Sequence, residues 1–280
     1  RDLHSFPTRR SSDLNLYGMV RVLVNGACGR MGQAVVRAVL EDEALTLAAA
    51  VDLKDGLDAG TLVGLSPCGV TVTVGLEAAI EAGKPDVMVD FTRPDVVFLN
   101  ALTAISKGVA PVIGTTGLSD EQKEALKKRS EETGTPVFIA PNFAIGAVLM
   151  MQMAQQAAKY LPDVEIIELH HDQKLDAPSG TAIQTADMIR AVRPSHAQGH
   201  PEEAEKLPGA RGAKIDGIPI HSVRLPGYVA HQEVIFGGLG QTLTIRHDSI
   251  DRTSFMPGVV LACKKVRSLK GLTVGLDKLL

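Results

Sequence analysis

Tryptophan is absent from this 280-residue chain, and aromatic residues make up only 4% of it. Single-stranded nucleic acid is bound largely on stacked aromatic side chains, so the sequence gives little support to that class of protein. The formal net charge is −3, which leaves no basic excess to attract nucleic acid or an anionic membrane. No apolar run approaches the roughly 18 residues that span a bilayer. We therefore expect a globular protein whose partner is neither nucleic acid nor a membrane.

Cysteine is also scarce, with only Cys28, Cys68 and Cys263 in the chain. An odd, scattered set suits a reducing compartment better than a disulfide framework. Its spacing matches no metal-binding motif, so we predict a cytoplasmic protein without a metal site. Hydrophobic residues at 45% and charged residues at 22% are ordinary for a chain of one large or two average domains.

Residues 1–18 have no helical or strand period and lack the long apolar core of a signal peptide. We interpret this leader as translated adaptor or vector sequence ahead of a natural start at Met19. A short native extension or an Arg- and Ser-rich transit peptide is the alternative. We assign the leader no function.

A strand, a glycine-rich turn and a helix are predicted from Met19 onward. The turn after the apolar residues 20–25 reads Gly26, Ala27, Cys28, Gly29, Arg30, Met31, Gly32. A helix with one apolar face and a second strand over residues 45–51 come next. This order is typical of a dinucleotide-binding unit, where the glycines permit a tight turn, close approach to a pyrophosphate and close helix–strand packing. We predict that these seven residues bind the cofactor; a structural unit without a ligand is the alternative.

The choice of cofactor depends on the end of the second strand. Asp52 follows Gly32 by twenty positions, which is the spacing of an acid that binds the adenosine ribose. Leu53 stands where an Arg would clamp a 2′-phosphate, so we favour NADH. Lys54 leaves NADPH open. Arg30 is placed to contact phosphate or stack on adenine.

Strands and helices alternate through the rest of the first half. Apolar runs predict strands over residues 70–74, 86–91, 111–113 and 136–140, with helices between them. Such alternation predicts a Rossmann-like, doubly wound parallel sheet, which we assign to residues 19–143. Ligands of these sheets lie at the carboxyl ends of the strands. We therefore expect three polar strand ends to line a nicotinamide and its ribose, through Arg93, Gly114, Thr115, Thr116, Pro141, Asn142 and Phe143.

The second half contains more hairpin signals. Strand-like runs over residues 218–225, 229–236 and 241–247 are joined by Pro-Gly and Gly-Gly turns, which predicts a meander. We assign residues 144–248 to a second, α+β domain with a mixed or antiparallel sheet. Residues 249–280 include a helix over 254–268 and an apolar end, and we expect this segment to return to the first domain.

One stretch of the second half, residues 168–182, concentrates groups that can bind anions and move protons. It lies between a predicted strand over 164–169 and a predicted helix over 181–189. Ser179 is a natural N-cap, and a helix N-terminus with Lys174 nearby suits an anionic substrate. His170 and His171 can exchange protons near neutral pH, but on a strand they point to opposite faces, so we expect only one to be the proton donor. A solvated loop with a capped helix is the alternative.

Five segments together resemble the dihydrodipicolinate reductase (4-hydroxy-tetrahydrodipicolinate reductase) family of diaminopimelate and lysine biosynthesis. They are residues 26–32, 90–94, 114–117, 142–143 and 168–181. The last of these, Glu-Leu-His-His-Asp-Gln-Lys-Leu-Asp-Ala-Pro-Ser-Gly-Thr, is highly specific. The resemblance extends over residues 20–280.

The resemblance implies a reduction of a cyclic dicarboxylate by NADH or NADPH, with loss of water. It implies that His170 is the catalytic proton donor and that Lys174 is the catalytic lysine. It places His171, Gly180 and Thr181 on the dicarboxylate, with Ser179 beside them. The nicotinamide side would be lined by Gly114, Thr115, Thr116 and residues 140–143, beginning with Ala140. It also implies a homotetramer built on the sheet of the second domain.

Two rival functions are considered. The first is another reductase of the same fold, such as an amino-acid dehydrogenase, and the string around His170 and Lys174 argues against it. The second is a dinucleotide sensor without catalysis, which the density of proton-transfer groups disfavours.

Overall fold

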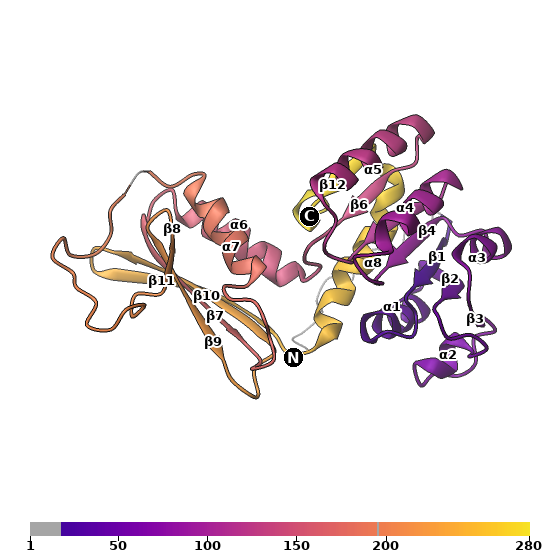
Figure 1. The fold of residues 1–280 in the computed structure, drawn as a ribbon, viewed down its shortest axis with the longest axis horizontal. Coiled ribbons are helices and arrows are strands. Elements are labelled where there is room, and N and C mark those ends of the chain that lie inside the picture. Colours follow the sequence, from indigo (N-terminus) through magenta and orange to yellow (C-terminus); the bar gives the residue numbers. More distant parts are fainter. Residues whose placement is uncertain (1–17, 195) are drawn as a thin grey trace, which may run out of the picture. The chain divides into compact units, whose positions relative to one another are not determined.

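The structure, a computed structural model, describes residues 18–194 and 196–280. All of the predicted leader except Gly18 lies outside the described residues. The chain divides into two compact units. The first contains the chain up to Pro141 together with Val259–Leu279, and the second is Asn142–Gly258. The path of the chain through both units is shown in Figure 1.

The first unit contains the predicted doubly wound parallel sheet. Its strands are ordered β12-β6-β5-β4-β1-β2-β3, and each neighbouring pair is parallel. The order reverses between β1 and β4, which is where such sheets bind their ligands. The strands are β1 (Val20–Asn25), β2 (Leu45–Val51), β3 (Val72–Thr73), β4 (Val87–Asp90), β5 (Ala110–Ile113), β6 (Val137–Ile139) and β12 (Leu272–Val274).

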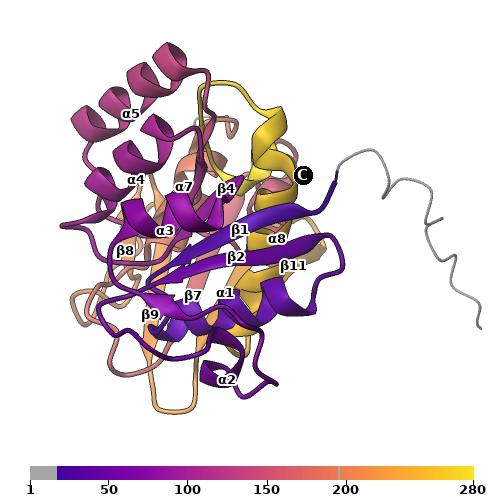
Figure 2. The ribbon, with the colours of Figure 1, turned by 90° about the vertical axis from the view of Figure 1, so that its right-hand side faces the viewer.

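Helices cover both faces of this sheet. Figure 2 shows α1 on one side of β1 and β2, with α3, α4 and α5 on the other. The short α2 lies in the connection between β2 and β3. The helices are α1 (Arg30–Glu41), α2 (Ala59–Leu62), α3 (Leu76–Gly83), α4 (Val97–Ser106), α5 (Asp120–Thr133) and α8 (Met256–Lys265), with 3₁₀ turns η3 (Val266–Ser268) and η4 (Leu276–Lys278). The first turn of α8 and the preceding 3₁₀ turn η2 (Arg252–Phe255) belong to the second unit.

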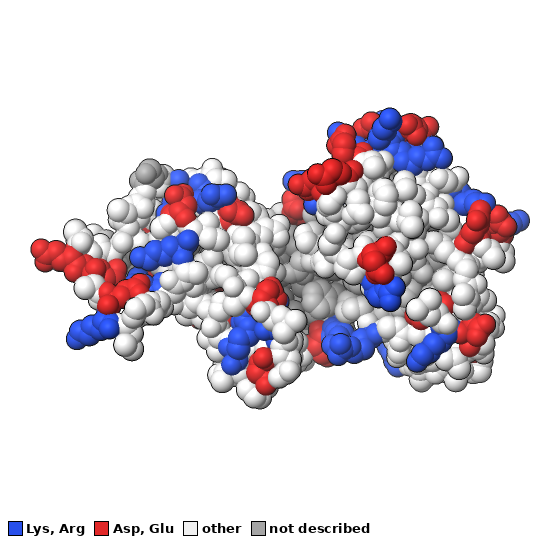
Figure 3. Space-filling view, viewed as in Figure 1, with Lys and Arg blue, Asp and Glu red and all other residues white. Residues whose placement is uncertain are grey.

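Local sequence explains these elements. The strand β1 is apolar on both faces, and Val22, Leu23 and Val24 are fully buried, as expected of a strand covered by helices on both sides. The helix α5 begins with a capping box, in which Ser119 and Gln122 bond reciprocally. Figure 3 shows acidic and basic side chains of α5 intermixed on its surface, where several i,i+3 ion pairs form.

The segment Val259–Leu279 belongs to the first unit. The strand β12 pairs in parallel with β6, so that Thr273 lies opposite Phe138. Lys265 Nζ of α8 donates to the Leu279 carbonyl at 2.6 Å, which fastens the last turn. This segment therefore adds a strand to the edge of the sheet.

The second unit is a five-stranded mixed sheet with two helices. The strand order is β11-β10-β7-β9-β8. The helix α6 packs against α7 and β11. The elements are α6 (Ile145–Ala157), β7 (Asp163–His170), α7 (Gly180–Arg190), β8 (Ala213–Ile215), β9 (Ile218–Arg224), β10 (Ala230–Gly238) and β11 (Gln241–Ser249).

The predicted meander is wrong at one pairing. Strands β10 and β11 form the expected hairpin, but β7 lies between β9 and β10 and pairs with both. The β7–β9 pairing is parallel, and α7 provides the long crossover that a parallel pair requires. No strand is predicted from the sequence at β8, because three residues carry too little periodicity.

The borders of the units differ from the predicted domain borders at two places. Asn142 and Phe143 belong to the second unit, where Asn142 Nδ2 donates to Thr181 Oγ1 at 3.3 Å. Residues 249–258 also belong there, because Ser254 bonds back to Ser249 at 3.1 Å. Among the helices of the described residues, none is long and apolar enough to cross a bilayer.

Candidate active site

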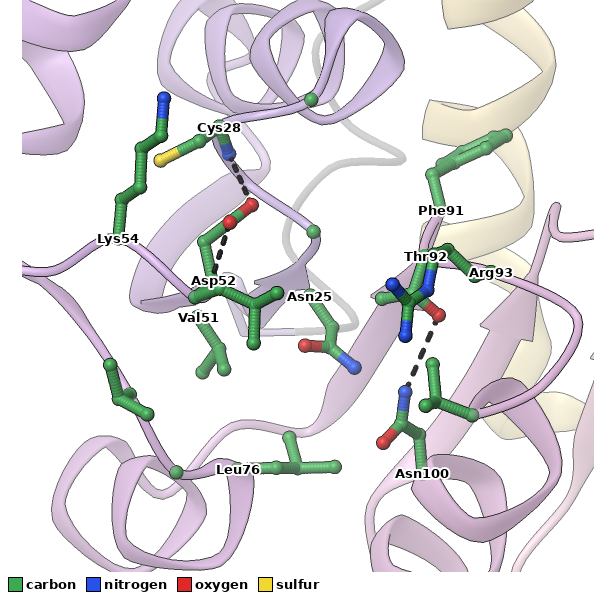
Figure 4. A pocket seen from close by; sticks show the side chains of 16 residues that line it. Asn25, Cys28, Val51, Asp52, Lys54, Leu76, Phe91, Thr92, Arg93 and Asn100 are labelled. Atoms are coloured by element: carbon green, nitrogen blue, oxygen red, sulfur yellow. Dashed lines mark hydrogen bonds between the residues drawn. The ribbon is translucent and has the colours of Figure 1, made fainter.

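A cavity of about 490 Å³ lies at the carboxyl ends of the central strands of the first unit. Figure 4 shows its lining, with Asp52 on one side and Thr92, Arg93 and Asn100 on the other. Gly26 contributes backbone to the same lining. The cavity is therefore at the predicted ligand position, beside the point where the strand order reverses.

The glycine turn has the geometry of a phosphate-binding loop. Gly26 has φ +84°, and a Cβ there would lie 2.7 Å from the Phe91 carbonyl oxygen. A Cβ on Gly32 would lie 1.9 Å from the Gly26 carbonyl oxygen, so only glycine permits this close packing. Gly29 is the N-cap of α1 and no side chain caps that helix. The first-turn amides of α1 are thus available to an anion.

Asp52 is tied to this turn by its carboxylate. It accepts hydrogen bonds from the Cys28 amide at 2.8 Å and the Leu53 amide at 2.7 Å. Each oxygen retains further acceptor capacity, so the carboxylate can still accept from a ribose hydroxyl. Lys54 lines the cavity as well, and Leu53 is 82% exposed.

Cys28 has the environment of a packing residue. Burial and the neighbouring Asp52 carboxylate raise the pKa of its thiol, against a smaller lowering by Lys54. A raised pKa disfavours the thiolate, which is the reactive form. The thiol is therefore suited to fill space in the turn rather than to act as a nucleophile.

The fully buried carboxylate of Asp90 was not predicted as part of the site. It accepts hydrogen bonds from Asn25 Nδ2 at 2.9 Å, Asn100 Nδ2 at 3.0 Å, Thr92 Oγ1 at 2.7 Å and Thr115 Oγ1 at 2.9 Å. Asn25, Thr92 and Asn100 line the cavity. Because their donors are directed to Asp90, the amide oxygens of Asn25 and Asn100 are left as acceptors. Asp90 therefore sets the polarity of this wall.

The other predicted cofactor residues of this unit have differing environments. Arg93 lines the cavity while bonding Asp95 through two nitrogens, and Thr115 bonds Asp90. A Cβ on Gly114 would lie 2.1 Å from the Phe91 ring, so Gly114 permits close packing. The remainder are outside the cavity lining: Ala27 and Ala140 are buried, Arg30, Thr116 and Pro141 are exposed, and Met31 is half-buried.

The observed cradle fits a dinucleotide. Gly32 admits no Cβ, and α1 has no side-chain cap at its N-terminus. Asp52 stands at the cavity as a ribose acceptor. These residues would hold the pyrophosphate and adenosine ribose.

In the second unit, His170 ends β7 and its side chain is 15% exposed. Its Nδ1 lies 2.5 Å from Glu168 Oε2. Glu168 is fully buried and also accepts two hydrogen bonds from Arg224, at 2.8 and 2.7 Å. The ring is therefore held by a carboxylate from its own strand, and that carboxylate is held by β9.

The Glu168 carboxylate is ionised. Burial alone would raise its pKa, but hydrogen bonds from His170 and Arg224 outweigh that effect and lower the pKa to about 2. Arg224 and Glu168 form a two-pronged pair, which is the strongest geometry for a guanidinium and a carboxylate. The buried charge of Glu168 is thus paired, while Arg224 Nε is buried without a hydrogen-bond partner.

Lys174 lies in the loop between β7 and α7, and its side chain is 21% exposed. Its Nζ donates to Asp176 Oδ1 at 2.7 Å, and this bond lowers the pKa of Asp176. The carbonyl of Asp176 accepts from Arg224 Nη2 at 2.8 Å. His171 is exposed, and its carbonyl accepts from the Lys174 amide at 3.2 Å.

The start of α7 has a side-chain cap at the position predicted for it. Ser179 is the N-cap, 3% exposed, and its hydroxyl accepts from the Ala182 amide at 3.2 Å. The Ser179 amide donates to Glu168 at 3.2 Å. No heavy atom would lie within 4 Å of a Cβ on Gly180. Thr181 accepts from Asn142, which was predicted to contact cofactor.

In the second unit, His170 and the Ser179 amide both bond Glu168, and Lys174 bonds Asp176, whose carbonyl accepts from Arg224. Thr181, in the first turn after Ser179, accepts from Asn142. Sequence reasoning missed Arg224 and the role of Glu168. One signal was present for Arg224, because it is a charged residue at the carboxyl end of a predicted strand. Within the described residues, no group of three or more His, Cys, Asp or Glu side chains could hold a metal ion.

A doubly wound parallel sheet with this glycine turn and a proton-transfer cluster on a second unit defines a dinucleotide-dependent oxidoreductase. The sequence models described as "Dihydrodipicolinate reductase, N-terminus" and "Dihydrodipicolinate reductase, C-terminus" match residues 20–143 and 146–280. The chain belongs to the dihydrodipicolinate reductase family.

Individual relatives agree with this assignment. The chain is 54% identical over 263 residues to 4-hydroxy-tetrahydrodipicolinate reductase of Desulfitobacterium hafniense (strain DSM 10664 / DCB-2), covering 93% of this chain and 98% of the relative. A solved, dipicolinate-bound dihydrodipicolinate reductase from Paenisporosarcina sp. TG-14 is 52% identical, with a TM-score of 0.84 and coverage of 94% and 100%. An amine dehydrogenase from Mycobacterium smegmatis is 16% identical with a TM-score of 0.64, covering 92% of this chain and 95% of the other, and shares the fold alone.

Proposed function

We propose that this chain reduces 4-hydroxy-tetrahydrodipicolinate to tetrahydrodipicolinate in the diaminopimelate and lysine pathway. The proposal is carried by the gathering of His170, Lys174 and the N-terminus of α7 around one buried ion pair. The overall change uses one hydride and one proton and releases one water. The relatives named 4-hydroxy-tetrahydrodipicolinate reductase and dihydrodipicolinate reductase support the same reaction.

The proposed cofactor is NADH, with NADPH also accepted. When bound, the reduced nicotinamide supplies the hydride. Asp52 at the cavity favours two free ribose hydroxyls, because a 2′-phosphate beside a carboxylate is repelled. Lys54 lines the same cavity and offers a cation to that phosphate, which supports dual use. Arg93, Gly114, Thr115, Thr116 and residues 140–143 are proposed to serve the nicotinamide side.

The second unit is proposed to hold the dicarboxylate. Lys174 supplies a full positive charge, and the free amides of α7 at Gly180 and Thr181 supply hydrogen-bond donors. The N-cap bond of Ser179 to Ala182 fixes that first turn. His171 is exposed beside the loop and is proposed to contact the second carboxylate. Dipicolinate bound to the Paenisporosarcina protein supports an aromatic dicarboxylate as a probe of this site.

His170 is proposed to supply the proton. Addition of a hydride to the conjugated imine leaves electron density on the ring, and a carbon or nitrogen of that ring must then accept a proton. His170 is partly exposed and oriented by Glu168, so it can meet a bound substrate. Lys174 stabilises the negative charge that develops during the step.

We further propose a homotetramer located in the cytoplasm. The strand β11 forms an edge of the second sheet, and most of its residues are exposed in the single chain, with Leu243 at 41%. The three cysteines are free, which suits a reducing compartment. Sedimentation should give a mass about four times the 29.7 kDa of one chain.

The decisive test is a steady-state assay in which the unstable substrate is generated by a coupled synthesis. NADH and NADPH are compared side by side, and oxidation of aspartate and of diaminopimelate is measured in parallel. We expect turnover of the cyclic intermediate only, with the higher kcat/KM for NADH. Oxidation of an amino acid, or dinucleotide binding without any turnover, would replace the proposal by one of the two rival functions.

A further inference from the structure

The buried carboxylate of Glu168 connects separate parts of the proposed site. It accepts from His170, from Arg224 and from the Ser179 amide. Arg224 in turn donates to the Asp176 carbonyl of the Lys174 loop. Because these partners come from β7, β9, the loop and α7, one ion pair determines where all of them lie.

The state of Glu168 decides which nitrogen of His170 can react. An ionised carboxylate only accepts hydrogen bonds, so His170 Nδ1 must carry a hydrogen. Nε2 is therefore the nitrogen that can give a proton to a substrate. The low pKa of Glu168, about 2, means that Glu168 does not take the proton itself.

The charges around His170 act in opposite directions. Glu168 on β7 stabilises the imidazolium, and Arg224 on β9 opposes it. The loop contributes Lys174 and Asp176, which are paired with each other. The strand β10 places the uncharged Ala230 opposite His170. The opposing charges of Glu168 and Arg224 are thus the main electrostatic influence on the imidazole ring of His170.

We propose that Glu168 and Arg224 are a positioning pair that selects Nε2 of His170 as the proton donor and places opposing charges beside its ring. Arg224 also fastens the loop that carries Lys174. This inference rests on the proposed function for its kinetic readout. It adds two residues that do not contact the reacting atoms.

The chain provides a matched control on the same strand. Glu165 lies on the opposite face of β7, where it bonds His221 Nε2 at 2.8 Å and Arg211 Nη2 at 2.6 Å. This second cluster contains the same three residue types, a Glu, a His and an Arg, but has no link to His170, Lys174 or α7. Glu165→Gln therefore removes a paired carboxylate from β7, one that is 31% exposed where Glu168 is fully buried, without touching the proposed site.

The primary test is the pH dependence of kcat/KM in the single variants. Glu168→Gln should move the alkaline fall in kcat/KM to lower pH by about one pH unit or more, because the imidazolium loses its anion while Arg224 stays. Arg224→Gln should move it to higher pH. Glu165→Gln should leave it in place. Unchanged profiles in both site variants, or an equal shift in Glu165→Gln, would overturn the proposal.

Two further measurements keep the proposal testable if a single variant does not fold or if the kinetic assay gives no turnover. The double variant Glu168→Gln/Arg224→Gln removes both charges, so we expect a near-wild-type pH profile with kcat lowered about 10-fold or more through misplacement. Undiminished kcat in that variant contradicts positioning. NMR titration of ¹³C-histidine-labelled, cofactor-free protein follows His170 directly, with its signal assigned in His170→Asn. It tests the inference even when wild-type protein does not turn over the proposed substrate, and an identical His170 titration in all variants refutes it.

Discussion

Two fully buried carboxylates, Asp90 in the first unit and Glu168 in the second, are surrounded by different kinds of donor. Each lies at or near the carboxyl end of a strand. Asp90 accepts from amide and hydroxyl groups, including Asn25 and Thr115. Glu168 accepts from a guanidinium and an imidazole. Asp90 orients neutral groups around a cavity, whereas Glu168 holds a group that gains and loses a proton.

The difference matches the two proposed tasks. A dinucleotide pocket needs side chains in fixed orientations, which neutral donors around one carboxylate provide without adding a titrating group. A proton donor needs a ring whose charge can change. The carboxylate beside that ring must therefore stay stabilised both when the ring is protonated and when it is neutral. Arg224 makes that possible because it keeps Glu168 paired when His170 is neutral.

The largest expected effect follows from removing the proton donor or the lysine. His170→Ala and Lys174→Ala should each lower kcat by about 10²-fold or more, since a general acid and a charge clamp each contribute that much. NADH binding, measured by fluorescence titration, should stay near the wild-type value. Near-wild-type turnover in both variants would remove the basis of the assignment.

A smaller effect is expected in the neutral network of the first unit. Asp90→Asn turns an amide donor toward the donors of Asn25 and Asn100, so urea unfolding should show a loss of about 2 kcal/mol. The dissociation constant for NADH should also rise. Asp95→Asn serves as the control, because Asp95 is exposed and should cost at most about 1 kcal/mol. Equal losses in the two variants would contradict the role given to Asp90.

Lowering the pH should reveal how much the Glu168–Arg224 ion pair contributes to the free energy of unfolding. The pKa of Glu168 lies below its usual range, so its stabilisation is present above about pH 4.5 and is lost as pH falls toward 2. Between these pH values, the free energy of unfolding of Glu168→Gln should fall by about 1 kcal/mol less than that of wild type. Urea unfolding midpoints measure the difference. Parallel curves for the two proteins would show that Glu168 does not contribute to the acid loss.

The smallest effect concerns cofactor choice. Lys54→Ala should raise the KM for NADPH about 3-fold or more relative to the KM for NADH, because a partly solvated cation near the cavity is lost. Steady-state kinetics with both cofactors measures the ratio. The control is Lys84→Ala, because Lys84 lies on an exposed turn at the end of α3. If the ratio of the two KM values is unchanged in Lys54→Ala, Lys54 does not contact the 2′-phosphate of NADPH.

Sequence reasoning was strongest where the determinants are local. The glycine turn, the alternation of strands and helices, and the N-cap at Ser179 each depend on neighbouring residues, and the structure contains all three. The family resemblance is confirmed by the matches of both sequence models. The roles of the individual site residues stay predictions.

The missed features depend on strand pairing between distant segments. Arg224 is 56 residues from Glu168, and they meet because β9 pairs in parallel with β7, which places Arg224 opposite His170. The predicted meander paired β9 with β10 and did not place β7 between them. Asp90 was missed for a similar reason, because its partners Asn25 and Thr115 meet only when β1, β4 and β5 are neighbours.

The contrast between the two carboxylates is tested most directly by one set of kcat/KM–pH profiles for wild type, Glu168→Gln and Asp90→Asn. We predict that the alkaline fall moves to lower pH in Glu168→Gln and stays at the wild-type pH in Asp90→Asn, even if the latter binds NADH less well. A fall that moves equally in both variants, or in neither, would contradict the account.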